Sequence, residues 1–208
     1  MYPSYAQSKL WGITYSSSGG SVYYTDKDGS HFTKTFSMDY NGRAGRDPNF
    51  LLQGSEGIVY GINNNGTIDT GEGVLFKIDK SGVKRICSLP YPVSSRASIV
   101  ELNGYLYGIG PALTATGGRG VVFRVKTDGT NYQSSEFAMY PLNTQGAITR
   151  TTAGDIFGMS ERGGANGMGF IYKIKHDVSG IQVIYNFNKS GGKRPFGKLG
   201  FIFFSLSW

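Results

Sequence analysis

The chain has few of the residues that form cross-links or metal centres. Its 208 residues include one cysteine, Cys87, and two histidines, His31 and His176. A single cysteine excludes a disulfide within the chain, and no cysteine or histidine pair has the spacing of a zinc site. We therefore expect Cys87 to be a small buried side chain and both histidines to have structural or surface roles. No metal and no cofactor is predicted.

Long hydrophobic runs are also missing. No apolar stretch approaches the roughly 18 residues that cross a bilayer as a helix, and no helical spacing of apolar residues persists beyond about two turns. In contrast, the chain contains 32 glycines, 14 tyrosines and 13 phenylalanines, whereas charged residues make up only 17%. This composition predicts strands joined by tight turns, few helices and no membrane span.

A motif of an aliphatic, an aromatic, a glycine and a second apolar residue occurs four times. The four copies are Leu10–Ile13, Val59–Ile62, Leu106–Ile109 and Ile156–Met159, and their glycines are 49, 47 and 50 residues apart. Self-similarity at a fixed period of 20 to 50 residues is the sequence signature of repeat folds. We refer to this motif as the tetrad.

Each tetrad is followed by the same series of anchors. A glycine precedes an aromatic residue by three positions, at Tyr23, Phe76, Phe123 and Tyr172, and a turn then ends at Gly29, Gly82, Gly129 or Gly180. A further strand then ends at Phe36, Leu89, Phe137 or Phe187. In the first three units, another apolar stretch leads from there to the next tetrad. The spacing predicts four strands per unit, with a hairpin in the middle.

These units predict an all-β protein, β-propeller-like, with four tandem four-stranded blades of about 48 residues. Residues 1–208 form one repeat domain, with repeats at 10–58, 59–105, 106–155 and 156–208. Two arrangements remain open from the sequence: a small closed ring, or an open fragment of a larger propeller. We favour the fragment, and a chain with open blade edges could associate through them.

The net charge of +7 is concentrated in the fourth repeat. The four repeats carry −1, +1, +1 and +5, and the excess comes mainly from lysines such as Lys173, Lys193 and Lys198. No recognition helix or stacking module accompanies these residues, so a nucleic-acid partner is not predicted. The glycine-rich loop 163–169 precedes a strand instead of a helix, which argues against a phosphate-binding loop.

The anchors resemble the GloVer tandem repeats of bacterial exported proteins, nearly from end to end. The resemblance is carried by the tetrads, the loop Glu161–Gly169, the strand Phe170–Ile174, the segment Tyr185–Phe187, and Gly191, Gly192 and Pro195. It implies a propeller-like, secreted or cell-surface protein of undefined activity, and it supplies no catalytic residues. The small residues Ser4 and Ala6 would suit a signal-peptidase site, but a charged and apolar signal region is not present in this chain.

Candidate sites are few. The loop 63–72 carries oxygen-bearing side chains, including Asp69 and Glu72, but it fits no defined calcium loop. The carboxylates of Asp26, Asp79, Glu101 and Asp155 recur in different strands or turns without marking a pair for acid–base catalysis. Neither the serines nor Cys87 lie in a nucleophile motif. We assign no catalytic residue.

Two function classes remain. The first is a noncatalytic exported or cell-surface propeller module that binds a glycan, a protein or a surface. Its possible contacts are the tyrosines at 15, 40, 91, 132 and 140. The second is a carbohydrate-active propeller hydrolase or lyase with carboxylates at the mouth of the central channel. A mouth site needs different polar residues at equivalent strand positions, whereas the tetrads repeat one apolar pattern, so the sequence favours the binding module. The apolar segment 201–208 stands where a fifth unit would open.

Overall fold

The computed structural model describes residues 9–15, 19–38, 45–65, 73–90, 98–112, 119–137 and 147–200. These residues form fifteen β-strands in four separate antiparallel sheets, which confirms the predicted all-β, propeller-like fold. In this part of the chain, the only helical element is the single turn η1 (Ser55–Gly57). No helix among the described residues has the length and hydrophobicity to cross a membrane.

Each sheet is a meander of consecutive strands. The first sheet contains β1 (Leu10–Thr14), β2 (Ser21–Thr25) and β3 (Thr33–Ser37). The second contains β4 (Arg46–Gln53), β5 (Val59–Asn65), β6 (Val74–Asp79) and β7 (Gly82–Ser88). The third contains β8 (Ser98–Leu102), β9 (Tyr105–Ala112), β10 (Arg119–Lys126) and β11 (Gln133–Phe137). The fourth contains β12 (Thr149–Arg150), β13 (Ile156–Ser160), β14 (Phe170–Ile174) and β15 (Ile181–Asn186).

The sheets begin one strand earlier than the sequence repeats. Strand β4 lies in the first repeat of the sequence but pairs with β5 in the second sheet, and β8 and β12 are shifted in the same way. The tetrads occupy β1, β5, β9 and β13. Strands β5, β9 and β13 are the second strands of their four-stranded sheets, whereas β1 is the first described strand of its sheet. The first sheet has three strands among the described residues, because β1 pairs with β2 and no other described strand pairs with it.

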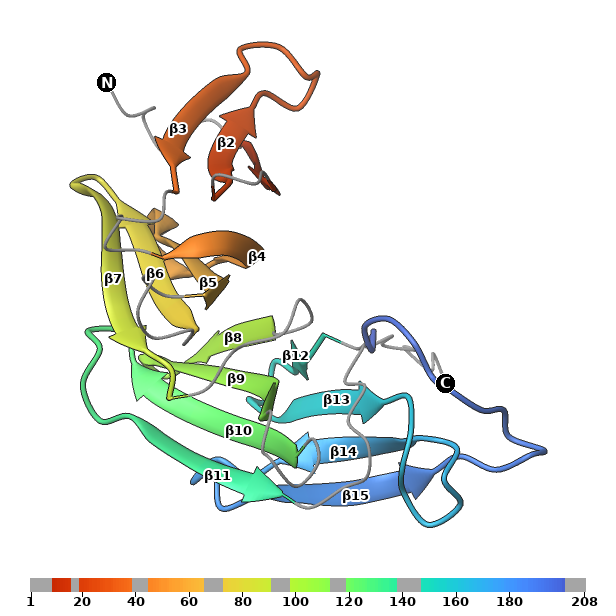
Figure 1. Cartoon of the computed structure of the whole chain (residues 1–208). Helices are drawn as coiled ribbons and strands as arrows, with labels where there is room; N and C mark the ends of the chain where they lie inside the picture. The colour runs from red at the N-terminus through yellow and green to blue at the C-terminus, as the bar shows by residue number, and fades with distance from the viewer. Residues whose placement is uncertain are drawn as a thin grey trace, which may run out of the picture.

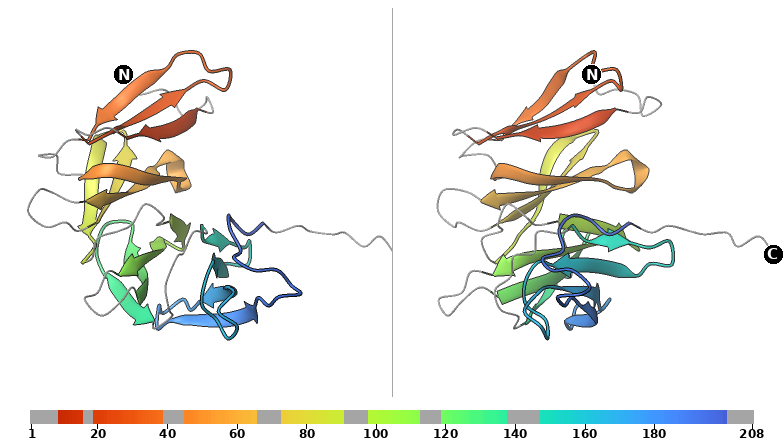
Figure 2. Two further views of the ribbon diagram at one scale, coloured as in Figure 1. Left: turned by 45° about the vertical axis from the view of Figure 1, so that its right-hand side comes forward. Right: turned by 90° about the vertical axis from the view of Figure 1, so that its right-hand side faces the viewer.

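The four sheets follow one another along an open arc, from the first sheet at one end to the fourth at the other (Figures 1 and 2). Strands β4, β8 and β12 lie on the inner side of this arc, and β7, β11 and β15 lie on its outer side (Figure 1). We call β4, β8 and β12 the inner strands. In the described residues the arc does not close into a ring.

The hydrophobic core consists of three layers, one between each pair of successive sheets. For example, Phe76 of the second sheet packs with Val22 of the first, and Leu75 on the opposite face packs with Phe123 of the third. A small sheet cannot bury both faces alone, so stacked sheets share their apolar side chains. This arrangement explains why the same residue types return in every repeat.

Candidate functional site

A pocket of about 540 Å³ lies where the inner strands of three sheets end. The second sheet contributes residues 52–55, at the end of β4 and in the loop that follows it. The remaining lining residues are Val100 and Glu101 of β8, Asn103 and Gly104 of the following turn, Thr149 and Arg150 of β12, and Lys198. Small-molecule sites usually have volumes of about 300 to 1,000 Å³ and lie where several structural elements meet. This pocket is the candidate site.

Three polar side chains occupy equivalent positions around the pocket. In each sheet, one inner-strand residue is paired with the first residue of the tetrad. These pairs are Gln53 with Val59, Glu101 with Leu106, and Arg150 with Ile156. An amide, a carboxylate and a guanidinium thus stand at one repeat position, and all three line the pocket.

This arrangement changes the conclusion drawn from the tetrads. The tetrads do repeat one apolar pattern, but no tetrad residue lines the pocket. The strand that varies is the inner strand, whose polar residues the sequence comparison did not align. The sequence held a signal for these residues, because Gln53, Glu101 and Arg150 lie at a nearly constant distance, six, five and six residues before their tetrads.

Glu101 connects two neighbouring sheets at the pocket. Its Oε2 accepts a hydrogen bond from the backbone N–H of Ser55 at 2.7 Å, and its Oε1 accepts one from the Ser55 hydroxyl, also at 2.7 Å. Because charge-assisted bonds are the stronger kind, this contact fixes both the carboxylate and the loop after β4. A side chain at Gly54 would come within 2.8 Å of Oε2, so the loop needs glycine there.

Tyr60 lies near this carboxylate and is buried. Burial raises the pKa of the Tyr60 hydroxyl, and the Glu101 carboxylate adds to the effect in second place. Both causes disfavour the phenolate, since it would be poorly solvated and would repel the carboxylate. Tyr60 therefore stays protonated.

Different hairpins give the pocket an irregular rim. The turn after β8 has Asn103 and Gly104 with φ of 51° and 75°, as expected for an Asn-Gly turn that joins two antiparallel strands. The loop after β4 is longer and holds a hydrogen bond from Gly54 N–H to the Ile58 carbonyl at 2.8 Å. Each loop therefore presents a different set of polar groups to the same pocket.

Arg150 and Lys198 give the pocket a cationic side. Both side chains are exposed, and they line the pocket together with Glu101. The formal charge of the lining is thus +1, from two cations and one carboxylate. Arg150 carries a planar set of five donors, which suits hydroxyl and carboxylate oxygens of a ligand.

The other carboxylates considered from the sequence do not converge on Glu101. Asp155 forms an ion pair with Lys173 at 2.6 Å, and Asp79 accepts a hydrogen bond from Ser81 N–H at 2.8 Å in its turn. Asp26 lies in the turn between β2 and β3. Among the described residues, Glu101 is the only carboxylate that lines the pocket.

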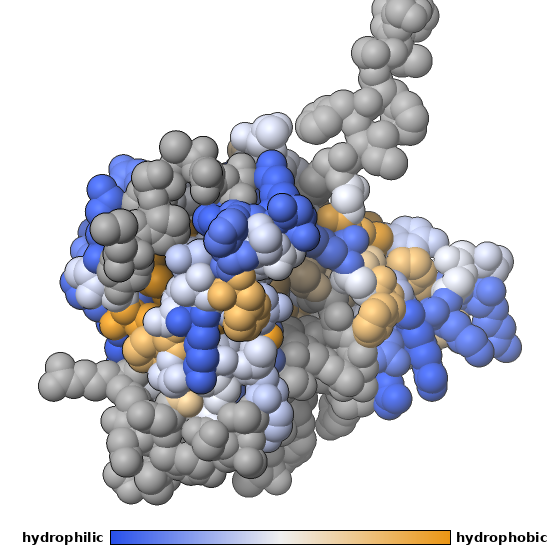
Figure 3. Space-filling view, turned by 90° about the horizontal axis from the view of Figure 1, so that it is seen from above, coloured by the Kyte–Doolittle hydropathy of each residue, from blue (hydrophilic) through white to orange (hydrophobic). Residues whose placement is uncertain are grey.

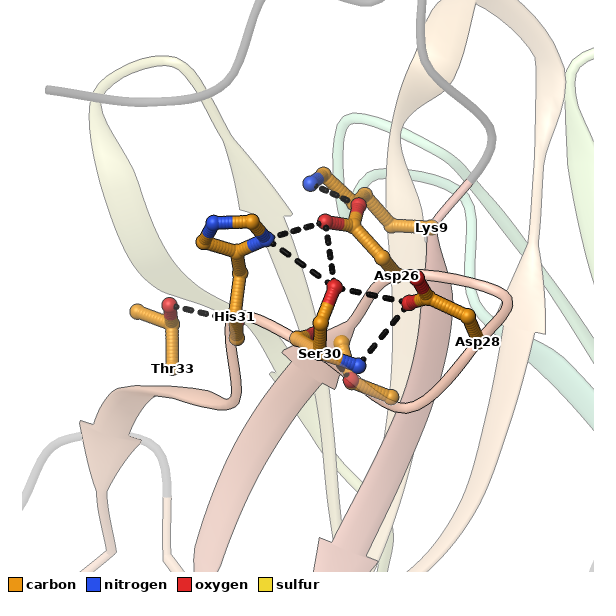
Figure 4. Close-up of polar contacts among 7 residues, drawn as sticks. Lys9, Asp26, Asp28, Ser30, His31 and Thr33 are labelled. Carbon is orange, nitrogen blue, oxygen red and sulfur yellow. Dashed lines mark hydrogen bonds and ion pairs between the residues drawn. The ribbon is translucent and has the colours of Figure 1, made fainter.

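A cluster around Asp26 contains the residue types of a catalytic triad (Figure 4). His31 Nδ1 lies 2.7 Å from Asp26 Oδ2 and 3.1 Å from Ser30 Oγ. A triad histidine uses one ring nitrogen for the carboxylate and the other for the nucleophile, whereas here one nitrogen serves both. Lys9 also bonds Asp26, and hydrogen bonds from Lys9 first and His31 second lower the pKa of Asp26. The cluster therefore organises an exposed turn and does not activate a nucleophile.

The single cysteine and the second histidine have structural environments. Cys87 is partly buried, and burial raises the pKa of its thiol to about 11. His176 Nε2 lies 3.1 Å from the Gly154 carbonyl, and the His176 carbonyl accepts a hydrogen bond from Arg124 Nη1 at 2.5 Å. These contacts agree with the structural roles expected from the sequence.

Several residues named from the sequence lie outside the described residues. They are Ser4, Ala6, Tyr40, Asp69, Glu72, Tyr91, Tyr140 and the segment 201–208. Of the remaining tyrosines, Tyr15 is exposed and Tyr132 is half-buried beside Phe123, and neither lines the pocket. The described residues include no group of three or more His, Cys, Asp or Glu side chains placed to hold a metal ion.

No family model and no curated protein sequence matches the chain. Solved structures share its fold. An α-L-arabinanase from Penicillium chrysogenum, determined with arabinobiose, matches with a TM-score of 0.60 and 16% identity over 89% of this chain and 65% of that chain. TolB from Acinetobacter baumannii matches with a TM-score of 0.51 and 14% identity over 85% of this chain and 41% of that chain. The chain thus spans less than two thirds of the length of either protein. These matches show a β-propeller fold.

Proposed function

We propose that the chain is a noncatalytic propeller module that binds a glycan in the pocket at the ends of the inner strands. The observation that carries the proposal is the set of Gln53, Glu101 and Arg150 at one repeat position around the pocket. An amide, a carboxylate and a guanidinium together offer donors and acceptors for several sugar hydroxyls. Because all three side chains line one pocket, a single ligand can contact them together.

Binding suits the described residues better than hydrolysis does. Most glycoside hydrolases use a pair of carboxyl groups, about 5 to 10 Å apart, on either side of the scissile bond. The described lining contains one carboxylate, and that group is engaged with Ser55. A single carboxylate held by two hydrogen bonds is a good acceptor for a ligand hydroxyl, but it lacks the partner that glycoside cleavage requires.

A carbohydrate-active enzyme is the second candidate. The fold likeness to a propeller arabinanase favours it, and Glu101 would then be one member of the carboxylate pair. The second carboxylate would have to come from outside the described residues. This candidate predicts product release from an oligosaccharide that the binding module would only retain.

We propose an extracytoplasmic location for the module, on the cell surface or secreted. The resemblance of the tetrads and of the loop Glu161–Gly169 to GloVer repeats supports it. Protease treatment of intact cells that express the full-length protein tests this proposal. Digestion without lysis is expected, and complete protection until lysis would overturn it.

Titration calorimetry with arabino-, xylo- and uronic-acid-containing oligosaccharides tests the binding proposal. We expect one ligand class to bind the purified chain, and we expect the variants Arg150→Ala and Glu101→Gln each to weaken its affinity about tenfold or more. The control variant Lys84→Ala changes an exposed cation on β7, away from the pocket, and should bind as the unaltered chain does. Chromatography of the same mixtures after incubation separates the two candidates, because only an enzyme shortens the oligosaccharide. Equal affinities for all four proteins would exclude this pocket.

A further inference from the structure

The outward face of the first sheet is apolar and uncovered in the described structure. We call Leu10, Gly12, Tyr23 and Phe32 the first-sheet end face. The exposed fraction is 53% for Leu10 and 63% for Phe32, and the Tyr23 and Phe32 rings lie 5.0 Å apart. Seen from above, this end of the molecule shows hydrophobic side chains among hydrophilic ones (Figure 3). Exposed apolar clusters rimmed by polar residues are typical of interaction sites.

The same face is covered in every later sheet. Val59, Gly61 and Phe76 are the equivalents of Leu10, Gly12 and Tyr23, because the register pairs Gly12 with Tyr23 and Gly61 with Phe76. Val59 is 4% exposed and Phe76 is fully buried, since the first sheet packs against them. The first-sheet end face is therefore one half of an interface that the structure forms three times between its own sheets.

The fourth sheet presents the complementary half. Phe157, Ile171 and Tyr185 lie on the face of that sheet that points away from the third sheet, and we call them the fourth-sheet end face. Side chains alternate between the two faces along a strand. Ile156, Tyr172 and Val183 pack against the third sheet, so their strand neighbours Phe157, Ile171 and the register partner Tyr185 lie on the opposite face. Tyr185 is 43% exposed, whereas Phe157 and Ile171 are half-buried.

The residues of the third sheet that are equivalent to the fourth-sheet end face are buried by the next sheet. Tyr107 and Val122 correspond to Phe157 and Ile171, because they flank the glycine–aromatic pair of the third sheet in the same register. Tyr107 is 4% exposed and Val122 is fully buried, packed against the fourth sheet. Both halves of the repeated sheet-to-sheet interface are thus present at the two ends of one chain.

We propose that the first-sheet end face of one copy of this chain binds the fourth-sheet end face of another copy, head to tail. Each contact continues the stacking used inside the chain, so the second copy is the partner that fits both faces.

A head-to-tail contact is heterologous, because it joins two different surfaces of the same molecule. This property allows a sharp test with two complementary variants. Leu10→Lys places a cation on the first-sheet end face, where the contact with the fourth-sheet end face would bury it. Tyr185→Lys places a cation on the fourth-sheet end face, where the contact with the apolar first-sheet end face would bury it without a partner. Both side chains are exposed, so each variant should keep the fold.

Sedimentation velocity of the full chain at rising concentration gives the result. We expect the unaltered chain to form dimers and longer species, and each variant alone to be monomeric. An equimolar mixture of the variants should form dimers and nothing larger, because each dimer joins the one intact face of each partner and ends in two altered faces. The control Lys84→Glu on the second sheet should associate as the unaltered chain does. Circular dichroism checks that every variant keeps its strands.

Two results would overturn the proposal. The first is an unaltered chain that stays monomeric up to about millimolar concentration. The second is a mixture of the two folded variants that stays monomeric although the unaltered chain associates, which would mean that other surfaces make the contact. Neither result bears on glycan binding, since the pocket residues are unchanged in both variants.

Discussion

The ring of Phe76 fills the space that a side chain at Gly61 would occupy. A β-carbon built on Gly61 would lie 2.0 Å from Phe76 Cζ, and the two residues face each other across β5 and β6. The same relationship holds for Gly12 with Tyr23, Gly108 with Phe123 and Gly158 with Tyr172, at 2.4, 2.1 and 2.3 Å. The tetrad glycine is thus explained by a close approach across the sheet. The aromatic ring lies over the strand and then joins the core between sheets.

Replacing Gly61 by alanine should destabilise the chain by roughly 1–3 kcal/mol, the usual cost of overpacking a core. The added methyl group forces the Phe76 ring out of a fully buried position. Urea unfolding followed by tryptophan fluorescence measures the effect. Gly200→Ala is the matched control, because nothing lies within 4 Å of a β-carbon there. Equal unfolding midpoints for the two variants would show that the Phe76 ring packs equally well without glycine at position 61.

Replacing Tyr172 by phenylalanine should leave stability unchanged or raise it by about 1 kcal/mol. The Tyr172 hydroxyl is buried and has no hydrogen-bond partner among the described residues. An unsatisfied buried hydroxyl costs about 1–3 kcal/mol. Phenylalanine already occupies the equivalent positions, as Phe76 and Phe123. Thermal unfolding of the two proteins provides the comparison, and a large loss of stability would mean that the hydroxyl has a partner.

The Cys87 thiol should react slowly with thiol reagents at pH 7 to 8. Burial raises its pKa to about 11, so the reactive thiolate is scarce at neutral pH. Reaction with a chromogenic disulfide, in native buffer and in denaturant, gives the two rates. We expect the native rate to be at least tenfold slower and to rise with pH up to the raised pKa. Equal rates in both conditions would contradict the buried position.

Acid should weaken the hairpin turns. Four turn carboxylates accept hydrogen bonds from the backbone N–H two residues later, and their folded pKa values lie below the ordinary value of 3.8: Asp28, Asp79, Asp128 and Asp177. A lowered folded pKa means that the stabilisation is fully present above the unfolded pKa and is lost as pH falls through the folded pKa. The groups are mainly exposed, so each effect should be small.

The variant Asp128→Asn isolates this effect, because it keeps the side-chain oxygen and removes the charge. Its unfolding midpoint should lie below that of the unaltered chain at pH 7. The two midpoints should converge as pH falls from 3.8 through the lower folded pKa, below which the carboxyl group is protonated in both folded and unfolded chains. A difference that stays constant across this range would show that the charge of Asp128 plays no part.

Sequence reasoning could identify the features that are local in the chain. The turns at Gly29, Gly82, Gly129 and Gly180 and the tetrad strands depend on neighbouring residues, so their spacing was enough to predict them. The pairing of β4 with β5, across the turn η1, could not be assigned from periodicity, because a strand of the same pattern could close either sheet. Only the packed structure shows to which sheet the strand belongs.

The candidate site was less accessible to sequence reasoning for a different physical reason. Gln53, Glu101 and Arg150 differ in chemistry, so a search for repeated residue types passes over them. Their shared property is a position opposite the first tetrad residue, which is known only once the strands are paired. The hydrogen bonds between Glu101 and Ser55 join residues 46 positions apart, which no local pattern indicates.

The one-strand shift between repeats and sheets separates two properties along the gene. The strand that carries the variable pocket residue belongs to one 48-residue unit, and the other three strands of its sheet belong to the next unit. Recombination that exchanges a whole unit would therefore move a pocket residue together with the body of the preceding sheet. A new combination of pocket residues could arise in this way while every pairing within each sheet retains its register.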